Sequence, residues 1–175
     1  MRRVVVVGNS GAGKSTVAAA LAGRLDAPHV ELDGIFHQPG WTPMPREEFR
    51  ERVAAVVAGD RWVVDGNYSS ASDIVWERAD TVVWVDPPRL TVTRRIIGRT
   101  LRRMASRQEL WNGNRERWRN LFSLDPQQSV IVWSVRRHHV VRERYAAAQH
   151  DPQWTHLRFV RLRTSRDVAA LLDAA

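Results

Sequence analysis

The sequence contains no cysteine, very little lysine and no long apolar run. The missing cysteines exclude disulfide bonds and thiolate metal sites, and they fit a reducing compartment, so we expect a cytoplasmic protein. No apolar run approaches the roughly 20 residues that a membrane-spanning helix needs, so we expect no membrane partner. The valines at residues 4–7 lead directly into a glycine-rich stretch, which is not the pattern of a secretory signal.

Lysine and arginine together number 27, and Lys14 is the one lysine, which leaves 26 arginines. With 19 acidic residues the formal net charge is +8. Such an excess indicates an anionic partner, either a phosphorylated small molecule, a nucleic acid or an acidic surface. Compositional bias explains the ratio of arginine to lysine but not the excess of positive charge. The position of the single lysine is therefore informative.

Short apolar segments that are typical of buried strands alternate with helical patterns along residues 1–175. The predicted strands are residues 4–7, 29–33, 61–66, 81–86 and 156–162. This alternation predicts one α/β domain, a three-layer sandwich around a five-stranded, mainly parallel sheet. Ligands of such sheets bind at the carboxyl ends of the strands, so we expect Gly8, Asp33 and Asp65 to lie near one another.

Residues 8–15 match G-x-x-x-x-G-K-S/T at every fixed position, with a predicted strand before the motif and a helix after it. Backbone N–H groups of such a loop surround phosphate oxygens, and the positive end of the following helix faces the same anion. Lys14 should reach the β- and γ-phosphates and Ser15 should hold Mg²⁺. The sequence thus predicts binding of ATP and Mg²⁺ by Gly8, Asn9, Ser10, Gly11, Ala12, Gly13, Lys14, Ser15 and Thr16.

Five segments in this order resemble the adenylate-kinase-like group of P-loop kinases: VVVVGNSGAGKST, ELDGIF, VVDGNYS, RADTVVWVDPP and RRIIGRTLRR. With LWNGNRE added, the chain is similar to the bacterial proteins often labelled topology modulation proteins, or adenylate-kinase-related kinases. The resemblance implies a nucleoside-monophosphate-kinase-like fold with a helical lid at about residues 95–125 and an acceptor-binding segment at residues 33–60. It also implies phosphoryl transfer from ATP to a small-molecule acceptor, with a nucleotide or nucleoside as the first expectation.

The resemblance further implies roles for individual residues. Arg95 and Arg99 match lid-entry arginines that contact the nucleotide and its phosphates, and Asp65 matches an aspartate beside the Mg²⁺ water shell. Arg103 follows at helical spacing on the same face, so we group it with them as catalytic. Where the family has Gly-Phe-Pro-Arg after the third strand, this chain has Gly-Asn-Tyr-Ser at residues 66–69, and the arginine that contacts an acceptor phosphate is missing.

Four residues are candidates for the acceptor side. Asp33 could accept a proton or hydrogen bond from an acceptor hydroxyl, although an aspartate there could equally cap a turn. Asn67 follows the third predicted strand, and Trp41 lies in a loop rich in proline and glycine. Trp111 lies in the predicted lid, and either tryptophan could stack on a base or close the acceptor pocket.

Two other functions stay open at this point. The acceptor could be a hydroxylated metabolite that is not a nucleotide. Alternatively, the charge of +8 could serve a nucleic-acid-binding regulator that ATP switches, although the sequence has no helix-turn-helix, zinc-finger or RNA-recognition motif. The oligomeric state has no signature in the sequence.

Overall fold

The computed structural model describes residues 1–106, 109–114 and 130–175. Its main sheet has five strands in the order β2-β5-β1-β6-β7, and every neighbouring pair is parallel. The strands are β1 (Arg3–Gly8), β2 (His29–Glu31), β5 (Trp62–Asp65), β6 (Thr81–Val85) and β7 (Arg158–Leu162). The predicted sheet is therefore confirmed.

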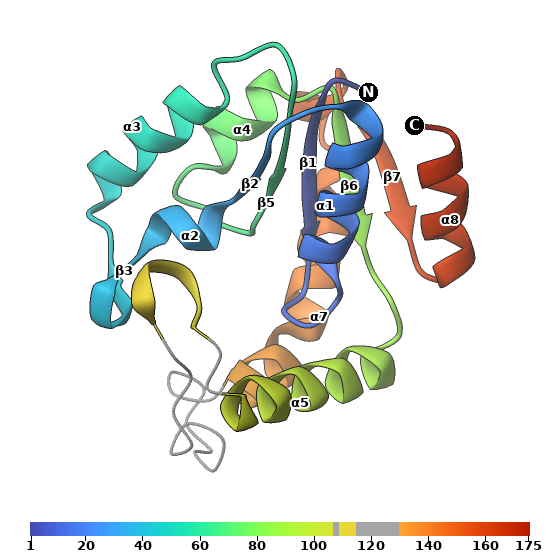
Figure 1. Ribbon diagram of the computed structural model, residues 1–175. Coiled ribbons are helices and arrows are strands. Elements are labelled where there is room, and N and C mark those ends of the chain that lie inside the picture. Colours follow the sequence, from blue (N-terminus) through green and yellow to red (C-terminus); the bar gives the residue numbers. More distant parts are fainter. Residues whose placement is uncertain (107–108, 115–129) are drawn as a thin grey trace.

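Helices cover both faces of the sheet, which makes the three layers (Figure 1). The valines of β1 show this, because Val4 and Val6 pack with Leu21 of α1, whereas Val5 and Val7 belong to a second core. Strand side chains alternate between faces, so burial of all four valines requires a cover on each side. The long helices are α1 (Lys14–Leu25), α3 (Arg46–Val56), α4 (Ser72–Arg78), α5 (Arg89–Ala105), α7 (Val130–Ala148) and α8 (Ser165–Asp173). Within the described residues, no helix combines the length and apolarity needed to cross a lipid bilayer.

The sequence predicted a strand that reaches Asp33 and then an irregular loop. The structure differs in this segment. β2 ends at Glu31 because its partner β5 ends directly opposite, at Asp65, and no strand remains to pair with. The chain instead forms α2 (Leu32–Phe36), which carries Asp33. An antiparallel hairpin follows, made of β3 (His37–Gln38) and β4 (Thr42–Pro43) around the 3-10 turn η1 (Pro39–Trp41).

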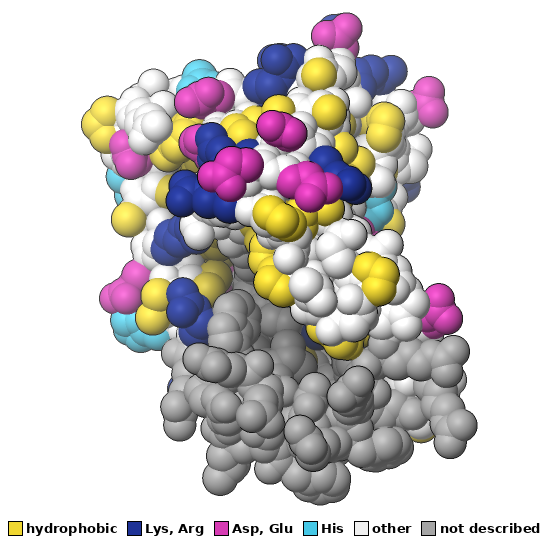
Figure 2. Space-filling view, turned by 90° about the vertical axis from the view of Figure 1, so that its left-hand side faces the viewer, with side chains coloured by type: hydrophobic (Ala, Val, Ile, Leu, Met, Phe, Trp, Pro, Cys, Tyr) yellow, Lys and Arg dark blue, Asp and Glu magenta, His cyan; other side chains and the backbone are white. Residues whose placement is uncertain are grey.

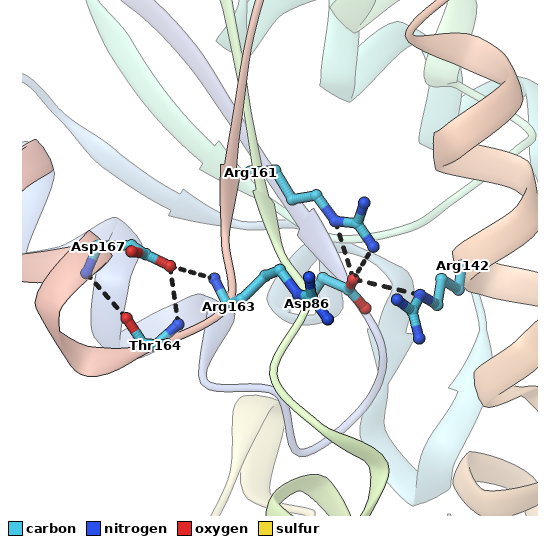
Figure 3. A network of polar contacts seen from close by, with 6 residues as sticks. All are labelled: Asp86, Arg142, Arg161, Arg163, Thr164 and Asp167. Atoms are coloured by element: carbon cyan, nitrogen blue, oxygen red, sulfur yellow. Dashed lines mark hydrogen bonds and ion pairs between the residues drawn. The ribbon is translucent and has the colours of Figure 1, made fainter.

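Asp86, directly after β6, ties the sheet to α7 (Figure 3). Its side chain is 6% exposed, and its carboxylate accepts a hydrogen bond from Arg161 Nε of β7 at 2.9 Å, while Arg142 Nε of α7 lies 3.4 Å away. The Arg161 guanidinium also lies over the Trp84 ring, 4.1 Å from its centroid. β7 and α7 therefore share one buried negative charge, beside the turn that leads into α8.

We predict that Asp86→Asn lowers the free energy of unfolding by about 2 kcal/mol, because Arg161 then keeps its charge in a partly buried site without a counter-charge. Arg142→Ala is the matched control. Its side chain is 46% exposed and its contact is longer, so the loss should stay below about 1 kcal/mol. Urea denaturation measures the free energy of unfolding of both variants. Equal losses would contradict the role of Asp86 as the counter-charge that β7 and α7 share.

Candidate active site

The phosphate loop connects β1 to α1 through backbone conformations that favour glycine. A Cβ on Gly8 would lie 2.3 Å from the carbonyl oxygen of Val85, and Gly13, with φ 103°, sets the first turn of α1. Across the loop, Lys14 Nζ donates a hydrogen bond to the carbonyl oxygen of Asn9 at 3.2 Å. Ser15 is exposed in the first turn of α1, where its hydroxyl is available to a metal ion. This local geometry fits a triphosphate bound at the start of the helix.

Lys14 lies close to two carboxylates. Burial in the loop lowers the pKa of Lys14, while the nearby Asp33 and Asp65 act in the opposite direction. Asp65 pairs with Val6 of β1 in the sheet register, one strand away from the loop. The carboxyl edge of the sheet therefore brings together the phosphate loop, Asp33 and Asp65, as the strand ends predict.

Helix α5 crosses the phosphate loop and brings two of the predicted arginines to it (Figure 1). Arg95 Nη1 donates to the carbonyl oxygen of Ala12 at 3.0 Å, and Arg99 Nη2 lies 3.5 Å from Ser10 Oγ. Arg103 lies one turn beyond Arg99 and is half-buried. Of the predicted lid, residues 107, 108 and 115–125 lie outside the described residues.

Asp33 is held by a tyrosine that follows β5. Tyr68 Oη donates to Asp33 Oδ1 at 2.6 Å, and His37 Nε2 lies 3.4 Å from the same hydroxyl. Burial and the charge of Asp33 raise the pKa of Tyr68, and burial lowers the pKa of His37. At neutral pH, Tyr68 therefore stays protonated and His37 uncharged. Sequence reasoning missed both residues, although Tyr68 comes soon after Asp65, which ends β5 at the carboxyl edge of the sheet.

Asp65 belongs to a group of three side chains that could hold a cation. One ligand atom each from His29, Glu31 and Asp65 lies within 4.8 Å of the others, and His29 Nε2 is 3.2 Å from Asp65 Oδ2. That hydrogen bond raises the pKa of His29, and burial together with Asp65 raises the pKa of Glu31. Carboxylate oxygens suit Mg²⁺. Sequence reasoning named only Asp65; the spacing of His29 and Glu31, two residues apart on one strand face, was the available signal.

Asn67 and Trp41, both predicted on the acceptor side, contact different parts of the site. Asn67 clamps the end of β1, because its Oδ1 accepts from the Gly8 N–H at 3.2 Å and from Tyr145 Oη at 3.0 Å, while its Nδ2 donates to the Gly8 carbonyl. Trp41 lies in the hairpin with its ring edge-on to His37, 5.2 Å between centroids. Asn67 thus supports the phosphate loop, whereas Trp41 reaches the surroundings of Asp33 through His37.

Charges of both signs are interspersed on the face that carries α3 and α4 (Figure 2). On α3, Arg50 donates two hydrogen bonds to Asp73 of α4, at 2.9 and 2.8 Å, and Arg52 pairs with Glu48 at 2.7 Å. In the predicted acceptor-binding segment, the guanidinium groups of Arg50 and Arg52 are therefore engaged with carboxylates.

Neither a protein-family model nor a curated protein sequence matches this chain. Solved structures of other proteins do match it. Shikimate kinase from Acinetobacter baumannii in complex with shikimate is 16% identical at a TM-score of 0.57, over 99% of this chain and 90% of that one. A gluconokinase from Sinorhizobium meliloti is 18% identical at 0.54, over 99% and 92%. Shikimate kinase from Bacteroides thetaiotaomicron is 14% identical at 0.52, over 99% and 95%. The chain thus has the three-layer α/β fold of P-loop kinases.

Proposed function

We propose that the protein is a kinase that transfers the γ-phosphoryl group of ATP to a hydroxyl group of a small molecule. The observation that carries this proposal is the position of Asp33, a carboxylate fixed by Tyr68 and placed beside Lys14 of the phosphate loop. Phosphoryl transfer to a hydroxyl needs cations around the migrating group and a carboxylate that takes up the hydroxyl hydrogen bond or proton.

On the nucleotide side, the loop from Gly8 to Thr16 would bind the phosphates through its backbone, with Lys14 as the central cation. The donors of Arg95 and Arg99 already face this loop, and they would offset the charge of the transferred group. We assign Arg103 to the same role. Ser15 and Asp65 would hold Mg²⁺, which would neutralise part of the phosphate charge.

On the acceptor side, we propose a hydroxyl rather than a phosphate as the attacking group. After β5, Asn67 binds the Gly8 backbone and Tyr68 binds Asp33 Oδ1, and the chain has no arginine at residues 66–69. Because Oδ1 already accepts from Tyr68, we assign Asp33 Oδ2 to the acceptor hydroxyl. The acceptor oxygen bonds to phosphorus, its proton passes to Asp33, and the bond from phosphorus to the leaving ADP oxygen breaks. Nucleosides and other hydroxylated metabolites fit this chemistry.

The proposal is tested by following phosphate transfer from labelled ATP across a panel of nucleosides, sugars, polyols and nucleoside monophosphates. We expect transfer to at least one hydroxyl acceptor, and we expect Lys14→Ala to abolish it. Transfer that survives Lys14→Ala would contradict the assignment of the phosphate loop. Transfer to the phosphate group of a nucleoside monophosphate, with hydroxyl acceptors inert, would contradict the role of Asp33.

A further inference from the structure

The turn at residues 110–114 lies against the acceptor-binding segment and away from the phosphate loop, although its sequence falls within the predicted lid. Figure 1 shows it as the yellow segment beside α2 and β3. The turn closes on itself through Leu110 N–H to the Asn114 carbonyl at 2.7 Å. Asn112 has φ 55° and Gly113 φ 77°, left-handed conformations that suit asparagine and glycine.

Trp111 fixes the start of α2. Its Nε1 donates to Glu31 Oε2 at 3.0 Å, one residue before the helix begins. Its ring also lies directly against Gly34, where a Cβ would come within 2.9 Å of Trp111 Cδ1. The indole therefore contacts Glu31 and Gly34, which lie before and after Asp33 in the chain.

Asn112 and Asn114 fix the end of α2 and the hairpin. Asn112 Nδ2 donates to the carbonyl oxygens of Gly34 at 3.1 Å and His37 at 2.6 Å. Asn114 is 3% exposed; its Nδ2 donates to the Gln38 carbonyl at 3.0 Å, and its Oδ1 accepts from the Trp41 N–H at 2.8 Å. These bonds go to backbone groups, so they constrain the path of the segment itself.

We infer that Trp111, Asn112 and Asn114 are positioning residues for the acceptor site, acting through Asp33 and His37. Helix α2 has five residues, far fewer than the roughly 12 at which an isolated helix becomes even marginally stable, so its geometry depends on outside contacts. The turn at residues 110–114 contacts both ends of α2. The inference rests on the proposed function, because it assigns these residues an effect on phosphoryl transfer.

The test compares Asn112→Ala and Asn114→Ala with Gln149→Ala, an exposed residue near the end of α7. In Asn114→Ala, we expect backbone amides of residues 33–42 to exchange hydrogen at least about tenfold faster, while β1 and β5 amides are unchanged. The affinity for a Mg²⁺-bound non-hydrolysable ATP analogue should stay within about twofold. For the acceptor found with the panel, kcat/KM should fall about 10- to 100-fold, since small displacements of a reacting group are costly.

Asn114→Asp keeps the oxygen that accepts from the Trp41 N–H, and it replaces the donor to the Gln38 and Trp111 carbonyls with a carboxylate oxygen. A buried negative oxygen beside two carbonyl oxygens is repelled, so amides of residues 33–42 should exchange at least as fast as in Asn114→Ala. Unchanged exchange at residues 33–42 in both alanine variants would overturn the inference, as would equal losses of analogue affinity and acceptor turnover. If the wild type transfers no phosphate, the proposed function fails, while the exchange measurement still decides whether the turn positions the segment.

Discussion

Replacing Lys14 with arginine is expected to lower kcat/KM for phosphoryl transfer by at least about 100-fold, the typical effect of removing one charge-stabilising donor. Lys14 Nζ lies inside the loop, 3.2 Å from the Asn9 carbonyl, with Asp33 and Asp65 nearby. A slim ammonium on a flexible stem fits between loop and phosphates, whereas a planar guanidinium is too broad. This explains why a chain with 26 arginines keeps one lysine, and keeps it at this position.

The variant should fold normally, because Lys14 makes one hydrogen bond to the loop and lies outside the packed cores. Thermal unfolding, analogue binding and steady-state kinetics together measure the effect. Arg24→Lys is the matched control: Arg24 lies at the last turn of α1 with 59% of its side chain exposed, so exchanging the cation there should change nothing. Full activity of Lys14→Arg would refute the size argument.

The phosphate loop and the sheet could be predicted because their signals are local. The spacing of glycines around Lys14 specifies the loop, and runs of valine specify strands buried on both faces. The carboxyl ends of parallel strands meet at one edge, which is why Asp65 could be placed near the loop before any contact was known. The helical spacing of Arg95, Arg99 and Arg103 likewise predicted a common face for them, and all three lie on α5.

The rest of the site depends on contacts between distant parts of the chain. Tyr68 reaches Asp33 across 35 residues, and Trp111 reaches Glu31 across 80. Neither contact leaves a pattern in the local sequence, because side-chain hydrogen bonds depend on how helices and loops pack after the sheet has formed. Asp33 itself was misplaced on a strand for the same reason: β2 ends where β5 stops pairing with it, and that limit is set by a strand about 30 residues later.

Replacing Asp33 with asparagine is expected to lower kcat for transfer by about 10²- to 10⁴-fold, the range of positioned acid–base groups. Asparagine has nearly the same shape, and its Oδ1 can still accept the hydrogen bond from Tyr68, so α2 should keep its position. What is lost is the negative oxygen that takes the hydroxyl proton. Tyr68→Phe should give a smaller loss, because it leaves the carboxylate in place and removes the hydroxyl that orients it.

Binding of the ATP analogue separates this effect from damage to the site. Asp33 lies near Lys14, so removing its negative charge removes a repulsion toward the phosphates, and the analogue should bind Asp33→Asn as well as the wild type or more tightly. A variant that loses both turnover and analogue affinity has lost the structure of the site, which would count against a chemical role. Asp60→Asn, at an exposed position before β5, provides the control for the substitution itself. If Asp33→Asn transfers phosphate at a rate within about threefold of the wild type, the loss is too small for a positioned base. Glu31 would then be the candidate for that base.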